Sequence, residues 1–168
     1  MYYTTFIGQG EVIVPALLLL MVIPRFRNWR FFITAACCNL LPFFIQQGLK
    51  SFFDHPRPHL LYYYEVDRMH YLTQWPLLLH RSFPSGHSQG ASSFFCFLSL
   101  LLPPRYNKLG FVFFLLMMMV CYSRIYLTAH FFDDIYFGSI LGGTLTIIIY
   151  SLLNKYSGPL FNKKDTFI

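Results

Sequence analysis

The sequence contains few charged residues. Only 12% of the chain is Asp, Glu, Lys or Arg, whereas about a quarter of a soluble domain is charged. Hydrophobic residues make up 55% of the sequence, and its mean hydropathy is +0.47. A chain of this composition cannot cover a water-facing surface, so the composition excludes a soluble globular protein and predicts an integral membrane protein.

Acidic residues are especially scarce, with 7 Asp and Glu against 13 Lys and Arg and a formal net charge of +6. A nucleic-acid-binding domain gathers its basic residues on one face or along one helix. Here the basic residues are scattered between apolar segments. We therefore interpret them as determinants of membrane topology and as ligand-binding groups, and we predict no nucleic-acid partner.

The sequence also lacks the spacings that mark disulfide frameworks and metal sites. Its cysteines lie inside apolar segments, where they act as small hydrophobic residues. They are Cys37, Cys38, Cys96 and Cys121. Asp54, His55 and His59, with His70 or His80, are candidate metal ligands, yet no tight spacing such as HExxH occurs. We expect no metal and no other cofactor.

Five apolar segments approach the length of about 20 residues that a membrane-spanning helix needs. They are Phe6–Ile23, Phe31–Leu49, Ser88–Leu102, Leu109–Tyr122 and Ile135–Asn154. The third and fourth are short, but each extends at one end through polar residues, which predicts helix tips covered by neighbouring protein. The sequence thus predicts an all-α membrane bundle of about five transmembrane helices, forming a single domain over residues 1–168. Met1–Gly10 has no basic region of the kind that opens a secretory signal.

Basic connections alternate with connections that carry His and Asp. The basic residues are Arg25, Arg27 and Arg30, then Arg105 and Lys108, then Lys155, Lys163 and Lys164. By the positive-inside rule these connections are cytoplasmic, which places the N-terminus and the connections 50–83 and 123–134 on the outer face. We expect a short interfacial helix or lid around Leu60–Leu72, because Tyr62–Tyr64 and Trp75 favour the headgroup level.

The connection 123–134 has the sequence SRIYLTAHFFDD. His130 and Asp134 are four residues apart, so on a helix they share one face and their side chains can meet. A carboxylate in contact with an imidazole fixes its tautomer and stabilises its protonated or substituted form. Arg124 adds a planar set of donors suited to phosphate or carboxylate. The alternative interpretation is a polar loop with a histidine that caps a helix.

The residues PSGH at 84–87 directly precede the third apolar segment and have the features of a helix N-terminus. Free backbone N–H groups and the positive end of the helix dipole form an anion site there. Ser85 can cap the helix, Gly86 lets an anion approach the backbone, and His87 stands beside the site as a proton donor or acceptor.

Two cations, Lys50 and Arg57, lie in the sequence KSFFDHPRP at 50–58. With Arg124 they provide three positive charges for the anion site at the start of the third segment. Because this set matches the charge and donor requirements of a phosphate, we expect the ligand to be a phosphate.

Together these three stretches resemble the signature of the type 2 phosphatidic acid phosphatase superfamily. The positions are Lys50-x6-Arg57-Pro58, then Pro84-Ser85-Gly86-His87, then Ser123-Arg124-x5-His130-x3-Asp134. Every signature position matches, in the family's order, and the apolar segments around them fit the family's membrane bundle. Membrane members usually have six spans with both termini cytoplasmic. Here five are expected, so the first span of the six would be lacking.

The resemblance implies a role for each signature residue. His130 would attack phosphorus and form a phosphohistidine, which Asp134 would orient and support, and His87 would protonate the leaving oxygen and then activate water. The phosphoryl oxygens would be held by Lys50, Arg57, Ser85, Gly86 and Arg124. Phosphoryl transfer depends mainly on positioning and charge stabilisation, so these groups would need no metal.

The implied activity is that of a lipid phosphatase in contact with membrane lipids, acting on a lipid phosphate or pyrophosphate. Its small size resembles a bacterial member, which implies the inner membrane with the site on the periplasmic side. A lipid phosphotransferase and a non-enzymatic anion-binding membrane protein remain as alternatives. The sequence leaves the lipid and the oligomeric state open.

Overall fold

A computed structural model of the protein describes residues 1–62, 78–157 and 160. The regular structure in these residues is helical, without strands, which confirms the predicted all-α class. The helices are α1 (Tyr2–Phe6), α2 (Gly10–Leu20), α3 (Trp29–Phe53), α4 (Pro58–Leu61), α5 (Gly86–Leu100), α6 (Asn107–Tyr126) and α7 (Phe132–Ser157), with 3-10 turns η1 (Pro24–Phe26) and η3 (Pro104–Tyr106).

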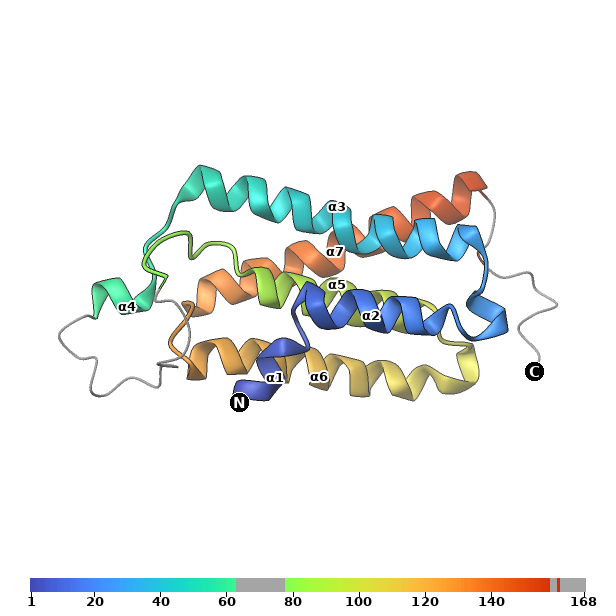
Figure 1. Ribbon diagram of the computed structural model, residues 1–168, viewed down its shortest axis with the longest axis horizontal. Coiled ribbons are helices and arrows are strands. Elements are labelled where there is room, and N and C mark those ends of the chain that lie inside the picture. Colours follow the sequence, from blue (N-terminus) through green and yellow to red (C-terminus); the bar gives the residue numbers. More distant parts are fainter. Residues whose placement is uncertain (63–77, 158–159, 161–168) are drawn as a thin grey trace.

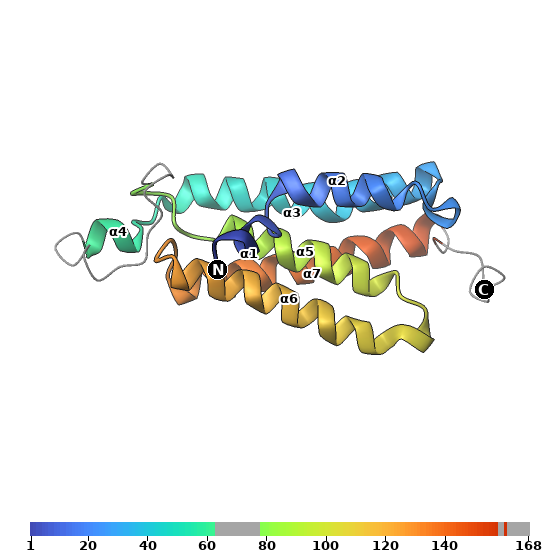
Figure 2. The same cartoon turned by 60° about the horizontal axis from the view of Figure 1, so that its bottom comes forward.

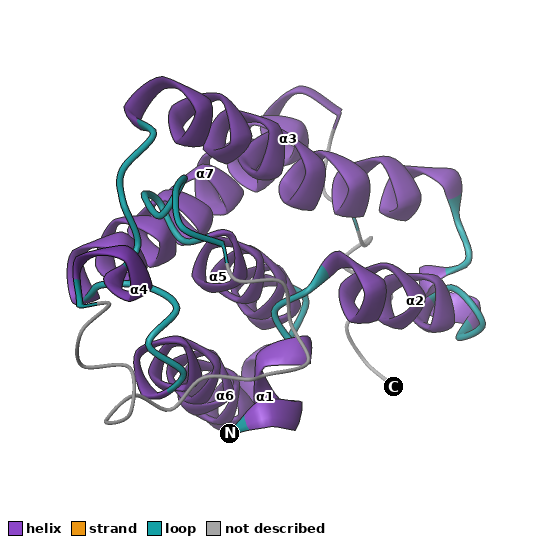
Figure 3. Ribbon diagram, turned by 60° about the vertical axis from the view of Figure 1, so that its left-hand side comes forward, coloured by secondary structure: helices purple, strands orange, loops and turns teal. Residues whose placement is uncertain are grey.

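The longer helices lie side by side along the long axis of the molecule (Figure 1 and Figure 2). Helix α5 lies at the centre, with α7, α6, α3 and α2 arranged around it (Figure 3). The first turn of α5 carries His87, so the central position of this helix brings the histidine within reach of its neighbours.

Small residues let α7 pack directly against α5. A Cβ atom on Gly138 would lie 2.6 Å from the Ser85 carbonyl oxygen, and one on Gly142 would overlap the Gln89 carbonyl oxygen. Ser92 Oγ donates to the Ser139 carbonyl at 2.7 Å across the same interface. Close backbone approach with hydroxyl bonds between helices is typical of membrane bundles, and it holds the N-terminal end of α5 against α7.

Three stretches of the described residues are long and apolar enough to cross a bilayer: Trp29–Leu61, Pro104–Tyr126 and Phe132–Tyr156. At 1.5 Å per residue, a helix of 20 residues spans about 30 Å, the thickness of the hydrocarbon core. Large apolar side chains such as Phe44, Phe111 and Ile148 are exposed on these helices. Such side chains are suited to lipid rather than water, in agreement with the predicted membrane bundle.

One expected segment differs from the structure, and a second lies mostly outside the described residues. The expected span Phe6–Ile23 is broken, because α1 ends at Phe6 and the chain turns before α2 begins at Gly10. The break occurs where the Gly8 backbone contacts α5, since a Cβ atom there would lie 2.6 Å from the His87 carbonyl oxygen. The expected interfacial helix around Leu60–Leu72 overlaps α4 only at Leu60 and Leu61, and its positions 63–72 lie outside the described residues.

The connections separate as the charge pattern predicts. The links that contain η1 and η3 lie at the same end of the bundle as the end of α7, on the right of Figure 1. The links that carry the signature residues lie at the opposite end, around α4 and the α6–α7 turn. The arrangement confirms that the basic connections share one end. The assignment of that end to the cytoplasm stays a prediction.

Candidate active site

His130 lies in the short turn between α6 and α7, and Asp134 lies in the first turn of α7. The two residues do not share a helix, because α7 begins only at Phe132. Their side chains nevertheless meet, with His130 Nδ1 3.5 Å from Asp134 Oδ2. Thr128, at a positive φ of 49°, turns the chain back after α6, and Asp134 Oδ2 accepts the Phe131 N–H at 2.9 Å. That bond caps α7 and fixes the carboxylate beside the imidazole.

Ser82 completes this group, although the sequence analysis did not identify it. Its hydroxyl donates to Asp134 Oδ2 and its Oγ lies 3.3 Å from His130 Nδ1. Ser82 is fully buried, and its two partners are 48 and 52 residues away in sequence. No local pattern marks such a contact; the only signal was its position two residues before Pro84.

The hydrogen bonds around His130 determine its tautomer. The single hydroxyl proton of Ser82 is used on Asp134, so Ser82 Oγ and Asp134 Oδ2 both face Nδ1 of His130 as acceptors. Nδ1 therefore carries the ring proton, and Nε2 keeps its lone pair. Burial lowers the pKa of His130 to about 3; Asp134 opposes the shift, while Arg57 and Arg124 add to it. The imidazole is therefore neutral near pH 7.

The PSGH stretch forms a helix N-terminus, as predicted. Ser85 is the N-cap of α5, its Oγ accepts the Ser88 N–H at 3.5 Å, and Gly86 is the first helical residue. The Ser85 N–H donates to the Asp134 carbonyl at 2.9 Å, which connects the start of α5 to the start of α7. The N–H groups of this turn can therefore bind an anion beside the histidine group.

The structure brings the three predicted cations to this end of the bundle. Arg57 is buried, with Nη1 donating to the Ala129 carbonyl at 3.1 Å and Nε to the His80 carbonyl at 3.1 Å. Arg124, also buried in the last turn of α6, donates from Nη1 to Thr5 Oγ1 at 2.8 Å. Lys50 lies in the last turn of α3. All three charges act on the imidazoles of His87 and His130, so positive potential converges where the phosphate is expected.

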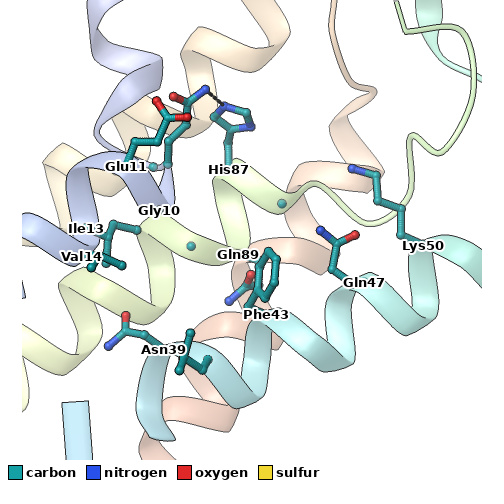
Figure 4. A pocket seen from close by; sticks show the side chains of 15 residues that line it. Gly10, Glu11, Ile13, Val14, Asn39, Phe43, Gln47, Lys50, His87 and Gln89 are labelled. Atoms are coloured by element: carbon teal, nitrogen blue, oxygen red, sulfur yellow. Dashed lines mark hydrogen bonds between the residues drawn. The ribbon is translucent and has the colours of Figure 1, made fainter. Parts of the chain in front are cut away.

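A cavity of about 440 Å³ opens between α2, α3 and α5 next to this site (Figure 4). Lys50, Gly86 and His87 line its polar end, and Ile13 and Phe43 line it farther along the helices. A second cavity of about 170 Å³ continues between α2 and α3, with residues that are almost all apolar. The two cavities share Ile13, Val14, Asn39 and Leu40.

His130 does not line either of these cavities, and only 3% of it is exposed. A phosphate in the larger cavity would meet Lys50, Gly86 and His87 first.

The chain is similar to known proteins in both sequence and structure. The sequence profile of the PAP2 superfamily matches residues 31–157. LpxE from Aquifex aeolicus has a similar structure, with 27% identity and a TM-score of 0.70, covering 89% of this chain and 82% of that one. A transmembrane PAP2-type phosphatidylglycerolphosphate phosphatase from Bacillus subtilis has 23% identity and a TM-score of 0.69, covering 92% and 75%, and this likeness concerns the fold. None of the curated proteins matches the chain significantly.

Proposed function

The chain belongs to the PAP2 superfamily, and from that premise we propose that it is a membrane phosphatase that hydrolyses a lipid phosphate or pyrophosphate at the outer face of the membrane. One observation carries the proposal: the buried His130–Asp134–Ser82 group adjoins the anion-binding start of α5. Binding alone would require the cations and the helix end, but neither an oriented neutral imidazole nor a second histidine beside it.

The reaction proceeds in two displacements. In the first, the lone pair of His130 Nε2 forms a bond to phosphorus while the bond to the leaving oxygen breaks, and His87 gives its proton to that oxygen. From a lipid phosphate the products of this step are the free lipid alcohol and a phosphohistidine; from a lipid pyrophosphate the leaving group is the lipid monophosphate. In the second, His87 removes a proton from water as the oxygen attacks phosphorus, the N–P bond breaks, and inorganic phosphate leaves.

Asp134 and Ser82 support the nucleophile in both steps. The imidazole gains positive charge as Nε2 bonds to phosphorus, and Asp134 Oδ2, 3.5 Å from Nδ1, stabilises that charge. Ser82 holds the carboxylate in place by its hydrogen bond. A carboxylate that fixes the tautomer and the orientation of an imidazole keeps its unprotonated nitrogen available for reaction.

Lys50, Arg57, Arg124 and the N–H groups at Ser85 and Gly86 stabilise the negative charge on the phosphoryl oxygens. A preorganised set of donors in a buried site stabilises a developing charge more than water does. In other phosphoryl transferases a divalent metal often supplies this charge. We propose that the three cations supply it here, so that the enzyme works without a metal.

The change from polar to apolar lining supports a lipid as the substrate. The larger cavity presents Lys50 and His87 at one end, and the smaller cavity continues between α2 and α3 past Leu17, Phe32 and Ala36. A lipid whose phosphate lies at Lys50 could place the first part of its tail in this apolar groove. Each methylene that leaves water for the membrane contributes about 0.8 kcal/mol, so a long tail anchors the substrate at the bilayer from which it enters.

Purified protein in detergent should release phosphate from long-chain lipid phosphates, with phosphatidic acid, phosphatidylglycerophosphate and a polyprenyl pyrophosphate as the first panel. A protein that binds these lipids without releasing phosphate would be an anion-binding protein, and the proposal would be wrong. Transfer of the phosphoryl group to an added lipid alcohol, in place of release, would identify a phosphotransferase.

A further inference from the structure

The N-terminal segment, which precedes the region matched by the PAP2 profile, reaches the site through one side chain. The amide nitrogen Nε2 of Gln9 lies 3.0 Å from Nε2 of His87, and the dashed line at His87 in Figure 4 marks this bond. We infer that Gln9 is a positioning residue for His87: its amide holds the imidazole through Nε2 and sets the orientation in which Nδ1 exchanges a proton with the substrate. The inference rests on the proposed function, because it is in that reaction that His87 exchanges a proton with the substrate.

The local structure directs this side chain toward the histidine. Gln9 is the N-cap residue of α2, but within the described residues its side chain makes no capping bond to that helix. Asn28 at α3 and Ser85 at α5 do use their side chains as caps. The Gln9 side chain therefore does not cap its own helix. Its amide instead forms a hydrogen bond with His87, which is 78 residues later in the sequence.

The backbone around Gln9 is fixed against the helix turn that carries His87. A Cβ atom on Gly8 would lie 2.6 Å from the His87 carbonyl oxygen, and one on Gly90 would lie 2.7 Å from the Gly8 carbonyl oxygen. The two glycines thus allow direct contact between the chain before α2 and the first turns of α5. Both partners of the hydrogen bond project from these two backbone segments in direct contact. The distance between them is therefore set by backbone packing as well as by side-chain conformation.

A second bond holds the same segment to the site. Thr5, at the end of α1, is fully buried and accepts a hydrogen bond from Arg124 Nη1 at 2.8 Å. The segment 5–9 therefore contacts both an expected phosphate-binding arginine and the expected proton donor. It forms one wall of the site, although no signature residue lies in it.

The chemistry of an amide suits a histidine that changes its protonation state during the reaction. The amide nitrogen donates to an unprotonated Nε2, and after rotation the amide oxygen accepts from a protonated Nε2, which keeps its proton while Nδ1 gives up or takes up the proton of the reaction. A glutamine can therefore hold the ring both as an acid and as a base. An alanine can hold neither form, and a glutamate carboxylate favours the protonated one.

Other charged and titratable groups also face His87 from the elements packed around it. They are Lys50, Arg57, Arg124 and His130, with Glu11 lining the same cavity. Substitutions at position 9 leave all of these in place. A difference between two variants at this position therefore reports on the contact with Nε2.

The test compares the full-length protein with Gln9→Ala and Gln9→Glu, and takes Val12→Ala, on the exposed side of α2, as the matched control. Gln9→Ala should lower kcat about tenfold and leave KM within about twofold. Gln9→Glu should move the alkaline limb of the kcat/KM profile upward by about one pH unit. Val12→Ala should behave as the unsubstituted protein. The inference would be overturned if the position 9 variants had the same kcat values and the same pH profiles of kcat/KM as the unsubstituted protein.

An NMR titration of the labelled His87 imidazole in detergent gives a readout that does not require turnover. The midpoint should be higher in Gln9→Glu than in the unsubstituted protein, and an unchanged midpoint would contradict the contact. If the midpoint moves but the unsubstituted protein releases no phosphate from any lipid, the proposed function fails while the Gln9–His87 contact stands.

Discussion

Asp134 Oδ2 lies 3.5 Å from His130 Nδ1 although the two residues do not share a helix. The turn before α7 places the imidazole over the helix start, where the carboxylate also caps the Phe131 N–H. One carboxylate thus stabilises the helix and orients the imidazole. Substitutions at this position should therefore affect stability as well as catalysis.

The first prediction concerns this pair. His130→Ala should abolish phosphate release, because it removes the atom that we propose bonds to phosphorus. Asp134→Asn should lower kcat by roughly 10²- to 10⁴-fold, because the amide can present its N–H to Nδ1 and select the wrong tautomer. Labelled substrate should give an acid-labile, base-stable phosphoenzyme in the unsubstituted protein. Circular dichroism should show an intact helical fold in both variants, and full activity in His130→Ala would disprove the assignment.

The second prediction concerns Ser82. Ser82→Ala removes the hydroxyl that donates to Asp134 and leaves that buried carboxylate with one bond fewer. We expect kcat to fall about tenfold or more with little change in KM, since Ser82 does not line the cavity. Ser99→Ala is the matched control, because Ser99 Oγ bonds only the Phe95 carbonyl of its own helix in the described structure. Equal losses in the two variants would indicate a general packing effect.

The third prediction concerns metals. Activity should persist in EDTA, because in the proposed mechanism Lys50, Arg57 and Arg124 supply the positive charge that a metal would otherwise contribute. Vanadate, which adopts the five-coordinate geometry of phosphorus in the transition state, should inhibit competitively. Loss of activity in EDTA that magnesium restores would show that the direct histidine mechanism is wrong.

Much of this arrangement was predictable from the sequence because its signals are local. The apolar segments predicted the longer helices, and PSGH predicted the start of α5, since caps and glycine act within one helical turn. The alternating basic connections predicted which links share an end of the bundle.

The contacts that the sequence did not predict are long-range. Ser82 reaches His130 and Asp134, and Gln9 reaches His87, only after the helices have packed. The expected span Phe6–Ile23 failed for the same reason: its hydropathy is continuous, but the Gly8 backbone docks on α5 and breaks the helix. These features depend on tertiary packing, which the hydropathy pattern of the sequence does not reveal.

The fourth prediction concerns topology. Single cysteines at Asn107 and at Tyr62, both exposed, mark the two ends of the bundle in a background that lacks the native cysteines. In intact cells an impermeant thiol reagent should label Tyr62→Cys and not Asn107→Cys, because the basic connections are predicted to be cytoplasmic. Both should label after the cells are permeabilised. Labelling of Asn107→Cys from outside would invert the proposed orientation.

The last prediction concerns the apolar groove between α2 and α3. If a lipid tail occupies it, kcat/KM should rise with acyl or prenyl chain length, because each buried methylene contributes about 0.8 kcal/mol. Glycerol phosphate and p-nitrophenyl phosphate lack this contribution and should be poor substrates. Efficient hydrolysis of soluble sugar phosphates would contradict entry of the substrate from the membrane.

A substitution in the groove can distinguish the contribution of the lipid tail to kcat/KM from that of the phosphate. Ala36 lines the smaller cavity of about 170 Å³, and Ala36→Phe would fill part of that volume. We expect kcat/KM to fall about tenfold for long-chain substrates and to stay nearly constant for a short-chain lipid phosphate, since the phosphate-binding residues are unchanged. Ile45→Phe, on an exposed part of the same helix outside both cavities, adds similar bulk and should leave both rates unaltered. An equal loss for long and short chains in Ala36→Phe would show that the groove does not hold the tail.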